Sequence, residues 1–164
     1  MILDERNEFA DNVSVAAAAG TALIGDVIDL DPAGIAPNTT IDLEGSDMYL
    51  VIQTGDTEII TGGSAGTLQF FLVSDALATL GAAVVANCTT HLTSASLVTD
   101  DSAANSAALN SGGTILVAKL PSGSYERYLG ILATTGTTTT TAGTINAFLT
   151  SDPALWRAYA DNVA

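Results

Sequence analysis

The sequence is short of the residues that make cross-links and metal clusters. Its 164 residues include a single cysteine, Cys88, and a single histidine, His91. One cysteine can form neither a disulfide within the chain nor a cysteine-based metal cluster. Cys88 closes a small apolar run and is interpreted as a small buried residue rather than a nucleophile. At this length, packing and hydrogen bonds are enough to hold one domain together.

Positive charge is scarce as well. Lysine and arginine together number 4 against 18 aspartates and glutamates, which gives a net charge of -14. Such a chain repels a phosphate backbone and an anionic membrane surface. We therefore expect neither nucleic acid nor membrane among its partners, and we expect the excess charge to favour solubility.

Long apolar runs are missing, and none approaches the roughly 18 residues that a membrane span needs. Residues 1–6 carry carboxylates where a signal peptide has a basic start and an apolar core. The sequence therefore predicts synthesis in the cytosol.

Catalytic motifs are missing too. A Ser/His/Asp hydrolase would have to use His91, and the sequence contains no Gly-x-Ser-x-Gly elbow. Cys88 and His91 are three positions apart on an extended segment, so their side chains should point to opposite faces. None of the 15 glycines forms a dinucleotide or phosphate loop motif. We predict a protein that is not an enzyme and has no cofactor; a sugar- or ester-cleaving enzyme built on His91 is the third hypothesis.

Carboxylates cluster in three places, and calcium prefers such oxygen-rich loops. The sequence has no Asp-x-Asp-x-Asp-Gly loop with a closing glutamate, so we interpret the clusters as solvated loop charge without a metal. Their members are Asp26, Asp29 and Asp31; Asp42, Glu44 and Asp47; and Asp100 and Asp101.

The feature that dominates the rest of the chain is a series of short β-type runs separated by Gly, Asp, Ser and Thr turns. Residues 48–54 have a continuous apolar centre, which predicts burial on both faces. About eight strands are the number expected of an antiparallel β-sandwich or a jelly roll. The predicted strands are 27–30, 48–54, 67–74, 82–88, 90–93, 114–120, 127–134 and 144–149.

The flanking segments give the domain organisation. We predict an extended N-terminal arm over residues 1–20, an all-β sandwich domain over 21–150 and a C-terminal arm over 151–164. Within the domain, residues 100–113 are expected to form a polar loop with one helical turn at 103–109. The threonine-rich residues 134–143 are expected to form a hairpin between two strands, or to extend them.

Contacts with other subunits are predicted for the arms and for one internal arginine. Arg127 is expected to form an ion pair within its own chain or across an interface, the former being favoured. The aromatic and arginine residues near the C-terminus are of the types that anchor interfaces, although packing over an open end of the sandwich is an equal alternative. The candidates are Ile2, Leu3, Arg6, Phe9, Arg127, Trp156, Arg157 and Tyr159.

In the order of its motifs the chain resembles the small jelly-roll capsid cement, or decoration, proteins of tailed bacteriophages, of the type known from a short-tailed Bordetella phage. The resemblance covers most of the chain. It runs through residues 1–4, 9–11, 27–30, 48–53, 67–72, 120–123, 126–129, 141–145 and 147–149, and it ends at Tyr159.

The resemblance implies a jelly-roll protein on the outer surface of an icosahedral phage head, made in the host cytoplasm. Its partners would be HK97-type major capsid protein, whose subunit contacts it stabilises, and further copies of itself. A dimer is favoured and a trimer is possible. The family supplies no catalytic residues. The alternative is a β-sandwich module of a phage tail or fibre that binds carbohydrate or a host surface.

Overall fold

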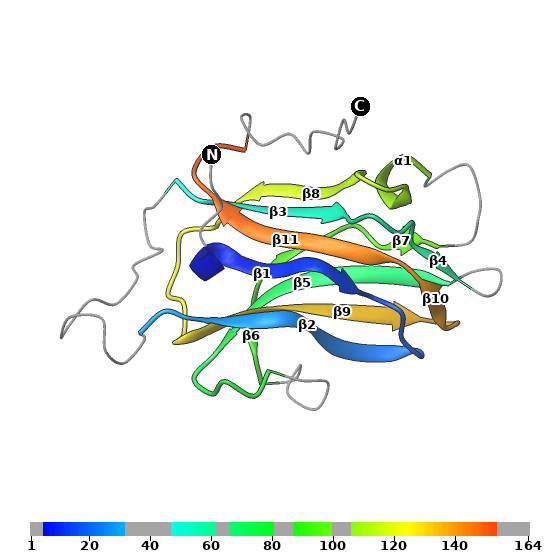
Figure 1. Cartoon of the computed structure of the whole chain (residues 1–164). Helices are drawn as coiled ribbons and strands as arrows, with labels where there is room; N and C mark the ends of the chain where they lie inside the picture. Colours follow the sequence, from blue (N-terminus) through cyan, green and yellow to red (C-terminus); the bar gives the residue numbers. More distant parts are fainter. Residues whose placement is uncertain (1–4, 32–46, 62–65, 81–86, 100–105, 154–164) are drawn as a thin grey trace.

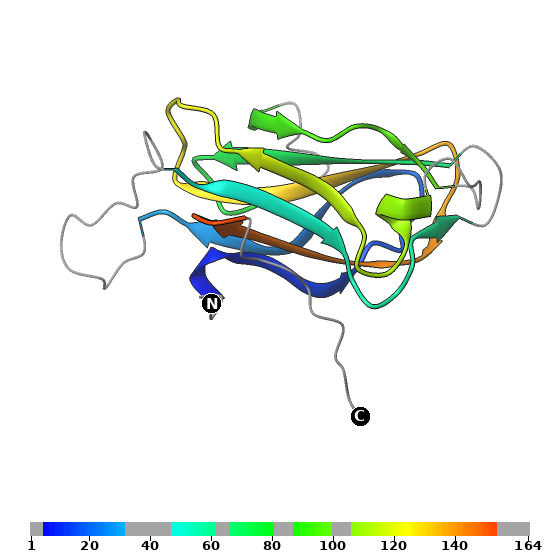
Figure 2. The same ribbon diagram turned by 90° about the horizontal axis from the view of Figure 1, so that it is seen from above.

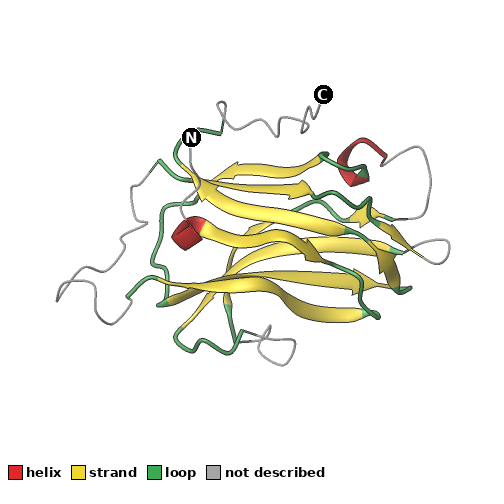
Figure 3. Cartoon of the chain, in the orientation of Figure 1, coloured by secondary structure: helices red, strands yellow, loops and turns green. Residues whose placement is uncertain are grey.

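The computed structural model describes residues 5–31, 47–61, 66–80, 87–99 and 106–153, and within these the chain is built almost entirely of strands (Figures 1 and 3). Two antiparallel sheets pack face to face, as expected of a β-sandwich. The sequence prediction of an all-β sandwich is confirmed.

One layer is a four-stranded sheet. Its strands are β1 (Glu8–Ser14), β11 (Thr144–Thr150), β3 (Tyr49–Thr54) and β8 (Thr114–Lys119), in that spatial order. All neighbours in this sheet are antiparallel. Strand β3 is buried from Leu50 to Thr54, which confirms the predicted burial on both faces.

The other layer is a five-stranded sheet. Its main path runs through β2 (Gly20–Asp29), β9 (Tyr128–Gly136), β5 (Thr67–Asp75) and β6 (Thr89–Thr93). The short strand β7 (Leu97–Val98) also pairs with β5, at Thr67 and Leu68, whereas β6 pairs with the later residues of β5.

Short elements complete the described part of the chain. Strands β4 (Ile60–Thr61) and β10 (Thr140–Ala142) form a two-stranded sheet at one end of the sandwich. The helical elements are η1 (Glu5–Asn7), a 3-10 turn, and α1 (Ser106–Leu109). Neither is long enough to cross a membrane. Helix α1 confirms the helical turn predicted at 103–109 in the part that the structure describes.

The order of the strands is that of a jelly roll. The eight main strands in chain order are β1, β2, β3, β5, β6, β8, β9 and β11. Numbered one to eight, they give the spatial orders 1-8-3-6 in one sheet and 2-7-4-5 in the other. This is the double Greek-key arrangement of two packed sheets.

The main core lies between the two sheets, where alternate residues of each strand point inward. Phe70 of β5, Ile52 of β3 and Ile131 of β9 are completely buried there, each with 0% of its surface exposed. A smaller apolar cluster of Val73, Leu80 and Leu132 covers part of the outer face of the five-stranded sheet.

Gly25 allows the two sheets to meet along one side of the sandwich, where β1 packs beside β2. It has a φ of +67°, and a Cβ placed on it would collide with the carbonyl oxygen of Phe9. The pairing of β2 with β9 is interrupted by an irregularity between Ile24 and Ile28 at the same place. A glycine is needed here because only glycine tolerates both the backbone angle and the close approach.

The predicted strands at 48–54, 67–74, 90–93, 114–120, 127–134 and 144–149 coincide with β3, β5, β6, β8, β9 and β11. Strand β2 includes most of the predicted run at 27–30 but begins earlier, at Gly20. The strand predicted at 82–88 lies almost wholly outside the described residues; Asn87 lies in a turn and Cys88 in a bend, so neither belongs to a strand.

Two of the sequence predictions are wrong, one about the N-terminal arm and one about the threonine-rich segment. Residues 8–14 are not part of an arm, because they form β1 and pair with β11. Residues 134–143 do not form a hairpin, because β9 and β11 belong to different sheets and β10 pairs with β4. The alternative that threonines extend the flanking strand holds for Thr134 and Thr135, which lie in β9.

Candidate functional site

Polar and ionisable side chains gather at the end of the sandwich where β5 ends and β6 begins. The connection from β8 to β9, residues 120–127, rounds this end and passes from one sheet to the other (Figure 2). Four residues meet there and are called the His91 cluster: Ser74 of β5, His91 of β6, and Tyr125 and Glu126 of the connection.

Direct contacts hold the His91 cluster together. The Ser74 Oγ lies 2.8 Å from His91 Nε2, and the Glu126 backbone N–H donates to the same Oγ at 3.2 Å. The rings of His91 and Tyr125 are stacked, with centroids 4.1 Å apart. The Tyr125 hydroxyl donates to the Pro121 carbonyl at 2.7 Å. These contacts connect an edge strand of one sheet to the connection that enters from the other.

The cluster has the residue types of a hydrolase without the required geometry. A Ser/His/acid site needs an accessible serine and a carboxylate on the far ring nitrogen of the histidine. Ser74 is fully buried, at 0% exposure. The Glu126 carboxylate instead accepts a hydrogen bond from the Thr89 hydroxyl at 2.9 Å. The arrangement therefore fits a structural junction better than a nucleophilic site.

Burial governs the protonation of this end of the sandwich. It lowers the pKa of His91 below its ordinary value, against a smaller opposing effect of the Glu126 charge. Burial likewise raises the pKa of Tyr125. The pKa of the Cys88 thiol is raised by burial and by Asp75, whose Oδ2 lies 3.7 Å from the sulfur. A thiol with a raised pKa is a poor nucleophile. Cys88 is only partly buried, so the prediction of a fully buried residue is wrong.

Arg127 forms an ion pair beside the cluster, and the favoured intrachain alternative is confirmed. Its Nε and one terminal nitrogen donate to the two carboxylate oxygens of Asp29, each at 2.9 Å. The guanidinium also lies over the ring of Tyr128, 5.0 Å from its centroid. The hydrogen bonds from Arg127 lower the pKa of Asp29, and those same bonds raise the pKa of Arg127.

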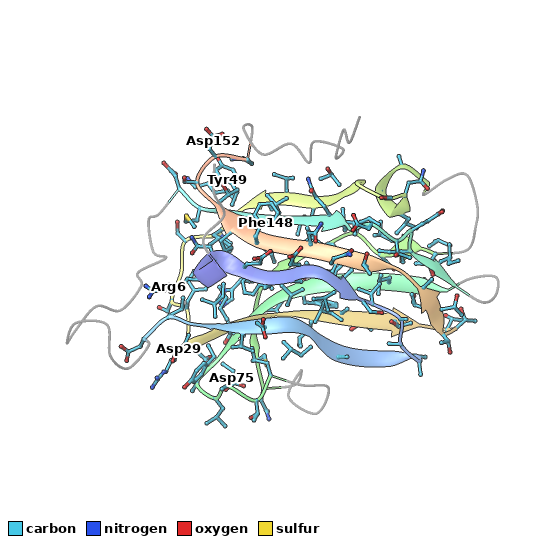
Figure 4. All side chains as sticks on the ribbon, in the orientation of Figure 1. Arg6, Asp29, Tyr49, Asp75, Phe148 and Asp152 are labelled. Atoms are coloured by element: carbon cyan, nitrogen blue, oxygen red, sulfur yellow. The ribbon has the colours of Figure 1, made fainter. Side chains whose placement is uncertain are left out.

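The ion pair and the cluster share one end of the five-stranded sheet. Asp29 of β2 pairs with Tyr128 of β9, and Tyr128 pairs in turn with Asp75 of β5, so the three residues form a row across the sheet. Figure 4 labels Asp29 and Asp75 at this end. The sequence marked Arg127 and the 120–130 segment, but it contained no sign that Ser74 would meet His91.

Of the other interface candidates, the structure describes Phe9 and Arg6. Phe9 lies in the main core with 1% of its surface exposed, so it is a packing residue rather than a surface anchor. Arg6 is exposed on η1. The remaining candidates lie outside the described residues; they are Ile2, Leu3, Trp156, Arg157 and Tyr159.

The outer face of the four-stranded sheet carries a row of apolar residues from three neighbouring strands, β8, β3 and β11. Val117 of β8 is 47% exposed, whereas Val51 of β3 beside it is 2% exposed. Phe148 of β11, which is labelled in Figure 4, is the next residue in the row and is completely buried. At the edge of the same sheet, Lys119 forms an exposed ion pair with Asp47.

The acidic clusters show no metal geometry in the part of the chain that the structure describes. No group of three or more possible ligands comes together among those residues. Asp29 is occupied by Arg127, while Asp26 and Asp31 are exposed. The other predicted cluster residues Asp42, Glu44, Asp100 and Asp101 lie outside the described ranges.

The sequence matches no protein family model and no curated protein.

Proposed function

We propose that this chain is a structural virion protein, a capsid cement that binds the outside of an icosahedral phage head and stabilises contacts between major capsid protein subunits. The observation that carries the proposal is the jelly-roll order of the two sheets, which is the architecture that the motif resemblance implies. The chain would act as a rigid clamp at symmetric positions, as a dimer or a trimer.

The positions of the resembling segments support this proposal. Residues 9–11 lie in β1, all but the first residue of 48–53 lie in β3, 67–72 lie in β5 and 147–149 lie in β11. These segments follow one another along the jelly-roll path, and three of them belong to the four-stranded sheet. A resemblance confined to turns or to one end of the chain would have given weaker support.

The charge of the surface supports an exposed position. Acidic side chains at Asp11, Asp26, Asp47, Asp56 and Glu58 are all exposed. A surface of this sign resists non-specific association and favours a partner with complementary positive charge. Many weak contacts, repeated by the symmetry of a shell, produce firm attachment without a large interface on each copy.

Binding to heads tests the proposal directly. The purified chain is added to expanded heads that lack it, assembled from the HK97-type major capsid protein of the same phage. We expect saturable binding at a fixed ratio to capsid subunits, seen by cosedimentation, and a higher temperature of head disruption. Electron cryomicroscopy of the loaded heads should show a β-sandwich bridging neighbouring capsomers.

The control is an unrelated acidic β-sandwich of similar size, which should neither bind nor stabilise the heads. Failure of the chain to bind would contradict the cement function. A glycan array then separates the alternative, because a saturable carbohydrate hit without head binding would identify a receptor- or sugar-binding module of a tail or fibre.

A further inference from the structure

The hydrogen bonds of Ser74 determine which nitrogen of His91 carries a proton. The Ser74 Oγ already accepts the backbone N–H of Glu126. Its own hydroxyl proton needs an acceptor, because Ser74 is fully buried and cannot turn to water. The acceptor within reach is His91 Nε2, at 2.8 Å. A nitrogen that accepts this bond carries no proton.

We propose that His91 is a proton-sensitive latch, held in the neutral form with its proton on Nδ1, which fastens the edge strand β6 to β5 and to the β8–β9 connection. The latch involves this end of the sandwich alone and does not depend on the function proposed above. Its basis is the arrangement of one hydroxyl between a backbone donor and a ring nitrogen.

Protonation of His91 breaks this arrangement. Nε2 would become a donor, so the Ser74 Oγ would face two donors and its own proton would lose its acceptor. An unsatisfied buried donor is costly, and the cluster avoids it by opening. The elements released are β6 (Thr89–Thr93), which has the sheet on one side only, and the connection that carries Tyr125.

The groups around His91 have opposing effects on its protonation. Glu126, on the connection, favours the protonated ring, but its carboxylate is also engaged by Thr89. Tyr125 stacks on the ring. Asp75, on β5, accepts hydrogen bonds from the Leu77 backbone and from Cys88. Burial outweighs the effect of Glu126, and the net result is a lowered pKa of His91.

Nuclear magnetic resonance tests the proton position without any substitution, because His91 is the only histidine in the chain. Long-range proton–nitrogen correlation of the 15N-labelled full chain near pH 8 should show Nδ1 protonated and Nε2 unprotonated. This is the less common neutral form of histidine in water. A spectrum with the proton on Nε2 would overturn the proposal.

Two variants test the latch. His91→Gln keeps an acceptor near the Nε2 position but cannot be protonated. Between pH 7 and pH 5, hydrogen exchange of the unmodified protein, corrected for intrinsic rates, should show a loss of protection of roughly fivefold or more in residues 89–93 and 121–127. The H91Q variant should show no such pH dependence.

Ser74→Ala removes the hydroxyl, and Thr89→Ala is its matched control, because Thr89 contacts Glu126 but not the ring. In S74A, the titration midpoint of His91 should be higher than in the unmodified protein, because the neutral ring loses the hydroxyl that donates to Nε2. In T89A, which keeps that hydroxyl, the midpoint should stay close to that of the unmodified protein. Equal pH dependence of protection in the unmodified protein and in H91Q would overturn the latch, whatever S74A does.

Discussion

At the scale of single residues, the sandwich depends on a few positions where only one residue type or one arrangement of hydrogen bonds fits. Gly25 is such a position, because it combines a left-handed φ with contact against the Phe9 carbonyl. Ser74 is another, since its hydroxyl is placed between a backbone donor and a ring nitrogen. Both residues join elements that are distant along the chain.

Substitution of Gly25 by alanine should destabilise the protein by about 2–5 kcal/mol, the sum of a strained backbone angle and an overpacked contact between β1 and β2. Gly112→Ala is the matched control. Gly112 has a similar φ of +74°, but a Cβ there would meet nothing within 4 Å. It should cost about 1–2 kcal/mol, from the backbone angle alone.

Urea unfolding followed by circular dichroism measures both free energies. The difference between the free energies lost in the two variants gives the contribution of the close contact between β1 and β2. Equal losses in G25A and G112A would show that β1 and β2 can move apart at no cost.

The sequence could indicate these residues only in part. Arg127 stood out because cations are rare in the chain, and its partner Asp29 belongs to a marked acidic group. The contact of His91 with Ser74 could not be foreseen, because the β5–β6 pairing has an irregularity between Leu72 and Val73 that shifts the register. An irregularity of this kind changes which side chains meet and leaves no local pattern in the sequence.

At the scale of elements, the strands that could be predicted are those with a strong apolar content. Strands β3 and β5 are rich in β-branched and aromatic residues and are deeply buried. Strand β1 was missed because it contains two aspartate or asparagine residues and has one irregular pairing after another. The two-residue strands β4 and β7 are too short for any periodicity.

The role of β1 can be tested by truncation. Removing residues 1–7 takes away η1 and leaves β1 intact, so the melting temperature should change little. Removing residues 1–14 also takes away Phe9 and exposes the edge of β11. Loss of a buried phenylalanine alone costs about 3–5 kcal/mol, a large part of the stability of an ordinary domain.

We therefore expect the shorter truncation to melt cooperatively and the longer one to be unfolded or aggregated, as judged by circular dichroism and size-exclusion chromatography. A cooperative transition in the chain that lacks residues 1–14 would show that the sandwich folds without β1 and would restore the interpretation of this segment as an extended arm.

At the scale of the whole molecule, the dominant property is the net charge of -14. Eighteen carboxylates on a small body repel one another, and this repulsion opposes the compact state. The ion pairs of Arg127 with Asp29 and of Lys119 with Asp47 lie at the surface and offset little of it. Screening by salt should therefore stabilise the fold.

Raising the salt concentration from about 0.01 M to about 0.15 M shortens the Debye length from about 30 Å to about 8 Å. We expect the melting temperature to rise, by roughly 2–4 °C for each kcal/mol of repulsion removed. Sodium and potassium chloride should act alike, whereas sucrose at matched osmolality should not reproduce the salt dependence. A melting temperature that is unchanged or lowered would mean that attractive pairs outweigh the repulsion.

Salt should have the opposite effect on attachment if the chain cements a capsid through complementary charge. Screening weakens the attraction between an acidic surface and a basic partner and slows their encounter. Within one salt series, the free chain should become more stable while its affinity for heads falls. An affinity that does not change with salt would place the contact on apolar surface, of which the exposed Val117 on the four-stranded sheet is one example. Opposite trends in stability and affinity would identify acidic side chains as the groups that meet the shell.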